Sequence, residues 1–327
     1  MTIREKKQQF EAQLPKGIYE SSKLTFYGVE GYTVYNCSIP FLWKGKTYIY
    51  GHVERFELWA QSFIQLFELI GPDTYAAVKS CFPFALEDPY VSAIQGEFVL
   101  GGTHVRKQRG GIDSVYGYFY RGNELDDLLY FTTGPENMKD IRLVDMRDGT
   151  IGVFSRPRSA EIQKQYGSES LIGFTRINSL DELSNTVIEN AKPIPDLFAD
   201  GEWGGCNQAY LLQNGKIGII GHQSYHDTDA NGGDLLVYVN TAFEFDPESF
   251  TTSPVQIIGT RCCYPEGPAK RPDLTDTTFT SGIAMRSDGK VDLYAGIGDC
   301  EEGRICIDYP FSAPMVEDEL IKLEASK

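Results

Sequence analysis

One short pattern recurs five times along the chain and constrains the fold more than any other feature. In each copy a turn glycine precedes a run of β-branched and other apolar residues, as in NGKIGIIGHQ at residues 214–223. Asn-Gly and Asp-Gly pairs, which begin three of the five copies, favour two-residue hairpin turns. Copies spaced about 50 to 75 residues apart, with several short strands per copy, are typical of a β-propeller. We therefore predict an all-β fold with five blades. The turn glycines are Gly45, Gly96, Gly149, Gly215 and Gly289.

The whole chain, residues 1–327, is predicted to form one propeller domain with short terminal segments outside the blades. Residues before 16 and after 312 are polar and helix-like, which predicts a short N-terminal helix and a polar C-terminal tail. Residues 56–70 also fit one face of a helix, but we interpret them as outer strands of the first blade. A β-sandwich is less consistent with the sequence, because sandwiches lack such a repeat. The blade cores are expected near residues 31–70, 84–132, 138–178, 204–245 and 276–311.

The charge of the chain limits its partners. The formal net charge is −16, which disfavours nucleic acid and anionic membranes, because both are bound through Lys and Arg. Any anion site must therefore be a local cluster of basic residues. The seven cysteines are scattered, and the Cys262–Cys263 pair resembles neither a disulfide nor a metal motif. No apolar run approaches the ~20 residues that cross a bilayer, and the N-terminus lacks a signal-peptide core. We expect a cytoplasmic protein without metal or cofactor.

A polar residue stands eight or nine residues before each turn glycine. The innermost strand of every propeller blade begins at the central channel, so these positions are expected to converge. A channel lined by residues that only bind water is the simpler explanation for each of them alone. Five polar residues at one register, with further polar groups beside them, instead indicate a ligand site. The residues are Asn36, Asp88, Asp140, Asn207 and Ser281.

Further polar residues follow the turns and suggest a type of ligand. Each could be structural by itself, and their periodic placement is what indicates a site. Trp203, beside Glu202, could stack on the face of a sugar ring. A polar funnel with an acid, several amides and an aromatic rim suits a carbohydrate. The residues after the turns are Glu54, Arg55, His104, Arg156, His222 and Asp299.

Two kinds of enzyme could use these residues. Asp88, in the sequence Glu87-Asp88-Pro89, is the strongest candidate acid, and burial together with Glu87 is expected to raise its pKa. A hydrolase needs a second carboxylate ~5 to 9.5 Å away. A phosphorylase needs instead cations that hold phosphate. Candidate second carboxylates are Asp140, Glu202, Asp276 and Asp299. Candidate cations and donors are Lys139, Arg156 and His222, with Arg55 near the mouth.

Short motifs in one order along the chain resemble two related families. EDP at 87–89, KD at 139–140, FSRP at 154–157, IIGH at 219–222 and FTSG…LYAGIGD between 279 and 299 resemble the five-bladed mannoside phosphorylases of glycoside hydrolase family 130. GGTHV at 101–105, KDIRLVDM at 139–146 and LYAGIGDCEEGRI at 293–305 more closely resemble the mannosyltransferase/phosphorylase family. That family is glycosyltransferase family 108, formerly a domain of unknown function. The resemblance extends from about Asn36 to Phe311.

The resemblance implies an inverting reaction in which phosphate attacks the anomeric carbon of a β-mannoside and releases α-mannose 1-phosphate. The implied substrate is a β-1,2-linked mannooligosaccharide, with inorganic phosphate as co-substrate and a mannose sugar nucleotide as a further donor in some members. Asp88 would be the general acid, acting directly or through a sugar hydroxyl. The implied sugar-binding residues are Asn36, Ser38, Arg55 and Asp299, and the implied phosphate-binding residues are Lys139, Arg156, His222 and Tyr225. The expected sugar-binding set also includes residues at or beside the same positions. These are Glu87, His104, Asp140, Asn207 and Gln208.

Two residues depart from the pattern of these families. The residue after the EDP motif, commonly Arg in the hydrolase family, is Tyr90 here, and the motif often written Lys-Asn is Lys139-Asp140. Asp140 would add a negative charge near the expected anion. A hydrolase on the same propeller and a non-catalytic sugar-binding propeller are the alternative functions. The oligomeric state is not predicted.

Overall fold

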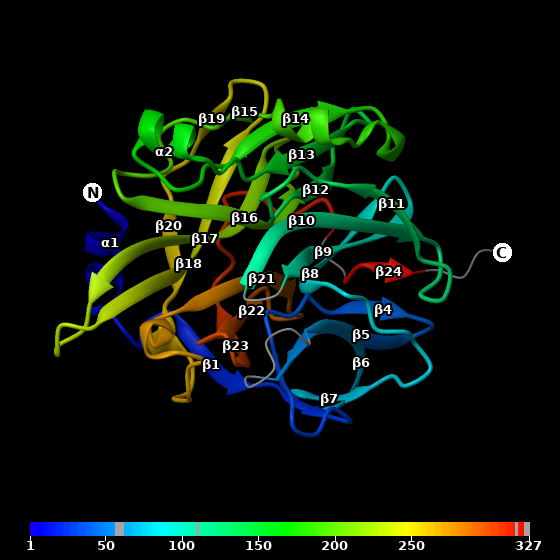
Figure 1. Ribbon diagram of the computed structural model, residues 1–327, viewed down its shortest axis with the longest axis horizontal. Coiled ribbons are helices and arrows are strands. Elements are labelled where there is room, and N and C mark those ends of the chain that lie inside the picture. The colour runs from blue at the N-terminus through cyan, green and yellow to red at the C-terminus, as the bar shows by residue number, and fades with distance from the viewer. Residues whose placement is uncertain (56–61, 109–110, 318–319, 324–327) are drawn as a thin grey trace.

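Five β-sheets surround a common axis in the order in which they occur along the chain (Figure 1). The computed structural model describes residues 1–327 except 56–61, 109–110, 318–319 and 324–327. Each sheet forms one blade, and the strand that precedes its turn glycine is the one nearest the axis. The predicted five-bladed β-propeller is therefore confirmed. Of the region 56–70 that also fitted a helix, residues 63–70 lie in a strand, and residues 56–61 lie outside the described residues.

The strands divide among the blades as follows. Blade 1 contains β2 (Thr25–Tyr27), β3 (Thr33–Tyr35), β4 (Phe41–Trp43), β5 (Lys46–Glu54), β6 (Phe63–Gly71), β7 (Thr74–Ala77) and β24 (Lys322–Leu323). Blade 2 contains β8 (Glu87–Ile94), β9 (Glu97–Gln108), β10 (Gly111–Gly122) and β11 (Leu129–Thr133). Blade 3 contains β12 (Arg142–Asp145), β13 (Ile151–Ser155), β14 (Gly173–Ile177) and β15 (Lys192–Pro193). Blade 4 contains β16 (Glu202–Leu211), β17 (Ile217–Thr228), β18 (Asp234–Asp246), β19 (Thr251–Thr252) and β20 (Gln256–Gly259). Blade 5 contains β21 (Thr278–Met285), β22 (Val291–Ile297), β23 (Glu301–Ile307) and β1 (Ile18–Lys23).

Helical turns are few and lie at the edge of the blades. The α-helices are α1 (Ile3–Glu11), α2 (Ala160–Tyr166) and α3 (Asn185–Glu189). Short 3₁₀ turns are η2 (Leu180–Glu182), η3 (Arg261–Cys263) and η4 (Pro272–Leu274). Of these, α2, η2 and α3 are inserted between the strands of blade 3.

The repeated glycine turn joins the innermost strand of each blade to the second strand. All five predicted turn glycines have φ between 77° and 85°, a left-handed backbone that side chains with a Cβ rarely adopt. The hairpins are β4–β5, β8–β9, β12–β13, β16–β17 and β21–β22. The repeat visible in the sequence is therefore the inner hairpin of each blade.

The two chain ends close the ring. Strand β1, near the N-terminus, pairs with β23 and completes blade 5, with Ser21 opposite Ile305. Strand β24, near the C-terminus, pairs in parallel with β4 of blade 1. The described part of the tail, residues 313–317 and 320–323, contains no helix. Met315 there is buried and bridges to Leu212, because the tail packs against the ends of the inner strands.

The predicted N-terminal helix is present and covers part of blade 4. The side chain of Thr2 accepts a hydrogen bond from Glu5 N, while Glu5 accepts one from Thr2 N, so the helix begins with a capping box. Ile3 is 1% exposed and packs on Tyr225 and on β18. Lys7 forms an ion pair with Asp276 at 2.9 Å. This helix therefore covers Tyr225, which is buried, and pairs with Asp276, which stays partly exposed.

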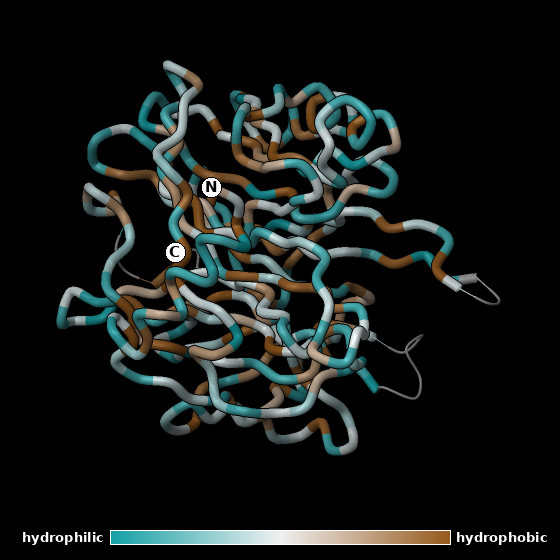
Figure 2. Tube along the Cα trace, turned by 90° about the vertical axis from the view of Figure 1, so that its left-hand side faces the viewer, coloured by the Kyte–Doolittle hydropathy of each residue, from teal (hydrophilic) through white to brown (hydrophobic). Residues whose placement is uncertain are grey.

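The apolar core lies between neighbouring blades and around the inner strands. Hydrophobic segments follow the strands, whereas many outer loops are hydrophilic (Figure 2). Tyr90 of β8 donates to Leu143 O of β12 at 2.8 Å and accepts from Leu143 N. Tyr210 of β16 makes the same pair of bonds with Ile283 of β21. All seven cysteines are free thiols. Among the described residues no helix has the length and apolar character needed to cross a membrane.

Candidate active site

Irregular backbone at the start of each inner strand turns the predicted polar residues toward the axis. Asn36, Asp88 and Asp140 have φ of 45°, 49° and 58°. The pairing of the inner strand with its neighbour shifts by one residue at Asp88, at Asn207 and at Ser281. Such bulges re-aim side chains and are frequent beside active sites. The common register in the sequence thus corresponds to irregular backbone in the structure: a bulge at Asp88, Asn207 and Ser281 and a positive φ at Asn36, Asp88 and Asp140.

A cavity of about 370 Å³ lies at this end of the axis, within the size range of small-molecule sites. Residues of all five blades, or of the loops beside them, line it, so its shape depends on the whole propeller. Six of the predicted site residues line the cavity: Asn36, Glu87, Asp88, Lys139, Arg156 and Asp299. Trp203, which was expected to offer an aromatic surface, also lines it.

Asp88 is buried at 7% exposure and contacts groups from two other blades. Asn36 Nδ2 donates to Asp88 Oδ1 at 2.8 Å, and Lys139 Nζ lies 3.4 Å from Oδ2. His52 Nδ1 lies 3.5 Å from Oδ1, which is long for a hydrogen bond. Burial alone would raise the pKa of Asp88, but Lys139, His52 and Asn36 outweigh it and hold the pKa well below its usual range. The expectation of a raised pKa is therefore wrong for the unliganded protein.

Glu87, the neighbour that was expected to raise this pKa, turns away from Asp88. Its carboxylate accepts a hydrogen bond from Ser62 Oγ and lies 3.5 Å from Lys107 Nζ. Asp88 has a left-handed backbone and is followed by Pro89, so the side chains of Glu87 and Asp88 point in different directions. Glu87 thus belongs to the rim of the cavity, whereas Asp88 belongs to its floor.

Asp299 is the second acidic group on the floor of the cavity. Burial, together with the charge of Asp88, raises the pKa of Asp299. The pKa values of the two carboxyl groups therefore shift in opposite directions, because Lys139 and Asn36 contact Asp88 directly. Nearby, Lys270 contacts the Glu54 carboxylate and lies 3.2 Å from the Tyr35 hydroxyl. This part of the cavity offers carboxylate, ammonium and hydroxyl groups to a polar ligand.

The opposite part of the cavity is basic. Arg156 Nε donates to Ser170 Oγ at 3.1 Å and to Gly204 O at 2.9 Å, and its Nη1 donates to Asp140 Oδ2 at 2.6 Å. These contacts fix the guanidinium, and no acceptor among the described residues meets Nη2. Lys139 lies beside it, and the carboxylates of Asp88 and Asp140 raise the pKa of Lys139 although burial lowers it. A fixed Arg and a neighbouring Lys form a suitable anion site.

Asp140 supports this basic region without lining the cavity. It is 4% exposed, and Arg142 Nη2 lies 3.4 Å from its other oxygen. Burial would raise the pKa of Asp140, but Arg156, Lys139 and Arg142 lower it. Its charge is thus balanced by basic groups, so the departure from a Lys-Asn motif adds a carboxylate that is paired with arginines. Tyr90, the other departure, joins blades 2 and 3 and lies outside the cavity lining.

His222 and Asn207 lie behind the cavity wall. His222 Nδ1 is 2.7 Å from Asn207 Oδ1, and the ring packs against Tyr238 and Phe279, which do line the cavity. Burial and Arg156 lower the pKa of His222 well below its usual value. The imidazole is therefore neutral and contributes no positive charge to an anion site.

The remaining predicted residues lie away from the cavity lining. Tyr225 packs under α1, where burial raises its pKa to about 12. Exposed Arg55 stacks on Tyr32 at 5.5 Å. The rings of His104 and Tyr118 stack at 4.5 Å, with His104 Nδ1 near Ala85 O. Ser38 bridges backbone groups of Ile39 and Tyr50, and Gln208 donates to Val91 O.

Several cavity residues were missed by the sequence reasoning. The clearest is His52, which is 3% exposed and whose two ring nitrogens have no hydrogen-bond partner among the described residues. A signal was present, because Gly-His follows the turn glycine at the same distance in KTYIYGH as in KIGIIGH. The others are spread over several strands and loops, and Phe279 begins the FTSG motif on the inner strand β21. They include Tyr35, Arg158, Glu169, Tyr238, Lys270 and Phe279.

Three of the four carboxylates proposed as hydrolytic partners of Asp88 have other contacts. Glu202 accepts hydrogen bonds from Ile3 N at 2.6 Å and from Ala199 N at 3.0 Å. Asp276 pairs with Lys7 of α1. Asp140 is held by arginines. Of the four, only Asp299 lines the cavity with Asp88.

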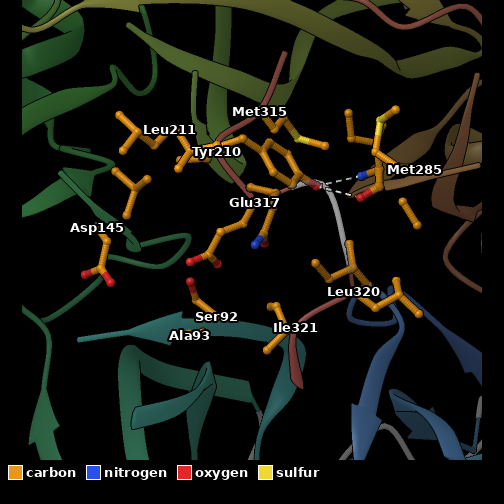
Figure 3. A pocket seen from close by; sticks show the side chains of 17 residues that line it. Ser92, Ala93, Asp145, Tyr210, Leu211, Met285, Met315, Glu317, Leu320 and Ile321 are labelled. Carbon is orange, nitrogen blue, oxygen red and sulfur yellow. Dashed lines mark hydrogen bonds between the residues drawn. The ribbon is translucent and has the colours of Figure 1, made fainter. Parts of the chain in front are cut away.

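The other ends of the same inner strands surround a second, less polar cavity of about 120 Å³ (Figure 3). Strand β8 contributes Asp88 to the first cavity and Ser92 to the second. Met315 and Ile321 of the C-terminal tail line the second cavity, where Gln208 also lies. Gln208 is therefore at the opposite end of the channel from the predicted sugar site.

One buried acid near the site predicts a pH dependence of stability. Glu302 accepts hydrogen bonds from Cys37 N at 3.0 Å and Ser281 Oγ at 3.1 Å, and burial raises its pKa from 4.5 to about 8. The folded state therefore binds a proton that the unfolded state releases above pH 4.5. The resulting stability is complete below pH 4.5 and is lost as the pH rises to about 8.

We expect Glu302→Gln, which mimics the protonated acid, to remove this loss. Its midpoint of thermal unfolding should exceed that of the wild type above pH 8 by several degrees, since a difference of about 1 kcal/mol shifts a domain of this size by about 2–4 °C, and the gap should close toward pH 4.5. Glu301→Gln, whose carboxylate pairs with Lys23, is the control. Parallel pH profiles for the wild type and Glu302→Gln would contradict the prediction.

Comparison with known proteins places the chain in a family. Residues 8–313 match a family model described as a protein of unknown function, DUF1861. The chain belongs to this family. Among solved structures, a mannose phosphorylase from Leishmania mexicana, in complex with a phosphate ion, is 50% identical. Its TM-score is 0.92, and the match covers 99% of this chain and 98% of that protein.

A second relative of this DUF1861 protein has a different activity. A GDP-Man-dependent mannosyltransferase from Leishmania mexicana is 46% identical, with a TM-score of 0.89 and coverage of 98% of this chain and 100% of that one. The chain thus shares its family with a mannose phosphorylase and a mannosyltransferase, as its motifs predicted. A structure reported for the GH130 family of mannoside phosphorylases is 15% identical, with a TM-score of 0.56 and coverage of 92% and 94%, so it shares the fold alone. No curated protein matches the chain.

Proposed function

We propose that this protein is an inverting phosphorylase of β-mannosides that uses phosphate to release α-mannose 1-phosphate. The observation that carries the proposal is the pairing, in one cavity, of the buried acid Asp88 with a fixed Arg–Lys anion site. Phosphate is already a nucleophile, so it needs positioning and charge stabilisation rather than a general base. Asp88 supplies the acid, while Lys139 and Arg156 supply the anion site.

The sugar is placed on the side of Asn36 and Asp299. Asn36 Oδ1 and both nitrogens of His52 are buried without a hydrogen-bond partner among the described residues, and hydroxyl groups of a sugar would satisfy them. The aromatic residues Tyr35, Trp203 and Phe279 add apolar surface on which a pyranose can pack. Phosphate on Lys139 and Arg156 then attacks the anomeric carbon, while the leaving oxygen takes the proton of Asp88 directly or through a sugar hydroxyl.

The proposed substrate is a β-1,2-linked mannooligosaccharide, and the reaction requires no cofactor besides inorganic phosphate as co-substrate. Support comes from the 50% identical mannose phosphorylase. A second candidate function is transfer of mannose from GDP-mannose, which the 46% identical transferase favours. Both reactions would place a phosphate group against the same cations, because the donor of the transferase is also a mannosyl phosphate.

The test is to incubate the purified protein with β-1,2-mannobiose and to identify the products by NMR with and without phosphate. We expect α-mannose 1-phosphate and mannose when phosphate is present, and no conversion in its absence. GDP-mannose with mannobiose tests the second candidate in the same assay. Free mannose formed at the same rate without phosphate would instead show a hydrolase.

A further inference from the structure

The resting state of Asp88 conflicts with its role as an acid. Its Oδ1 accepts from Asn36 Nδ2 at 2.8 Å, and its Oδ2 faces Lys139 Nζ at 3.4 Å. Both contacts come from donors, which favour an ionised carboxylate. An ionised Asp88 has no proton to give to a leaving group. The proton must therefore arrive during the catalytic cycle.

Lys139 connects the acid to the expected anion. Its ammonium group donates to Asp88 Oδ2 at 3.4 Å and also lines the cavity beside Arg156, with a third of its side chain exposed. An anion bound to Lys139 and Arg156 would compete with Asp88 for the same ammonium group. It would also add negative charge close to the carboxylate, and a nearby like charge disfavours the ionised form.

We propose that Asp88 takes up its proton only when an anion occupies the Lys139–Arg156 side of the cavity, so that phosphate loads the acid as it binds. The proposal rests on the proposed function and adds an obligatory order of events to it. A glycoside bound without phosphate meets an ionised Asp88 and is not cleaved. This would prevent unproductive hydrolysis in a cavity that also admits water.

The proton balance closes without any further reactant. Dihydrogen phosphate that enters the cavity can pass one proton to Asp88 and remain as hydrogen phosphate, or hydrogen phosphate can bind while Asp88 takes up a proton from the buffered solvent. An oxygen of hydrogen phosphate then bonds to the anomeric carbon as the bond from that carbon to the leaving oxygen breaks. The leaving oxygen receives the proton of Asp88, which is again ionised and paired with Lys139.

Other titratable groups lie around Asp88, and none of them replaces the uptake of a proton with the anion. From blade 1, His52 Nδ1 lies 3.5 Å from Oδ1 and Tyr35 stacks on that imidazole at 4.4 Å. From blade 5, Asp299 carries a like charge, whose ionisation is already disfavoured by burial. Asp299 is therefore the one other carboxyl of the cavity floor that could take up a proton, and it must be tested separately.

The experiment is calorimetric titration of the protein with inorganic phosphate near neutral pH in buffers of different ionisation enthalpy. The dependence of the observed heat on the buffer gives the number of protons taken up per phosphate bound. We expect the wild type to exceed Asp88→Asn by between about a half and one proton, since one carboxyl group changes state. Asp299→Asn should keep this excess.

The outcomes separate this proposal from the proposed function. Phosphate binding with equal proton uptake in the wild type and Asp88→Asn would overturn the proposal and leave phosphorolysis intact. If Asp299→Asn took up fewer protons than the wild type while Asp88→Asn did not, the proton would belong to Asp299. This result would also overturn the proposal. The absence of phosphate binding in the wild type would contradict both. An infrared difference spectrum provides a second readout: phosphate should produce the carbonyl band of a protonated carboxyl in the wild type, and this band should be missing from Asp88→Asn.

Discussion

Asp88→Asn is expected to lower the turnover number for phosphorolysis about 1,000-fold, because general acid catalysis contributes about 10²–10⁴-fold. The amide keeps the size of the side chain and can still face Asn36 and His52, but it has no proton of suitable acidity for the leaving oxygen. The Michaelis constants for mannoside and phosphate should change by less than about tenfold, since the acid acts mainly in the transition state.

Glu87→Gln is the matched control for Asp88→Asn. Glu87 is the adjacent carboxylate of the same motif, yet it contacts Ser62 and Lys107 at the rim. We expect it to keep turnover within about tenfold of the wild type, because it is not in the path of the proton. Steady-state rates at saturating substrates measure both variants. Equal losses for the two variants, or a loss in Asp88→Asn that is confined to mannoside binding, would contradict the assignment.

Arg156→Ala is expected to raise the Michaelis constant for phosphate about 100-fold, because removing one partner of a buried charged contact costs about 2–5 kcal/mol. The constant for the mannoside should change much less. The guanidinium is held in place by Asp140, Ser170 and Gly204. Initial rates at varied phosphate and fixed mannoside measure the effect.

Two further variants separate phosphate binding from folding. Arg158→Ala removes an exposed arginine of the same cavity, whose Nη2 lies 3.8 Å from Glu169, and should alter the phosphate constant by less than about threefold, as exposed ion pairs contribute about 0–1 kcal/mol. Arg156→Lys retains a charge near Asp140 and should fall between the wild type and Arg156→Ala. If Arg156→Ala lowered the unfolding midpoint without changing the phosphate constant, the arginine would be structural only.

The fold and the position of the site could be predicted because both depend on local backbone requirements. Each inner hairpin needs a residue with positive φ, and glycine meets this need at the five turns. Three of the five polar positions have a left-handed backbone, and they hold Asn36, Asp88 and Asp140, residue types that tolerate it. The periodicity of the sequence therefore predicted both the propeller and the convergence of polar groups on its axis.

The electrostatics could not be predicted in the same way, because they depend on contacts between blades. Lys139 and His52 are distant from Asp88 in the sequence, yet they decide the direction of its pKa shift. Tyr225 was misplaced because helix α1 folds back over blade 4 and covers it. Gln208 follows Asn207 in the sequence, but it belongs to the opposite end of the channel. The alternation of side chains along a strand decides the position of Gln208, and long-range packing decides that of Tyr225.

The central claim is that the anion held by Lys139 and Arg156 is the nucleophile, and the initial rate of mannobiose cleavage at increasing phosphate concentration tests it most directly. The account predicts a rate that rises hyperbolically from zero, with one α-mannose 1-phosphate formed for each mannobiose cleaved. A rate that is already maximal without phosphate, with mannose as the only product, would contradict it.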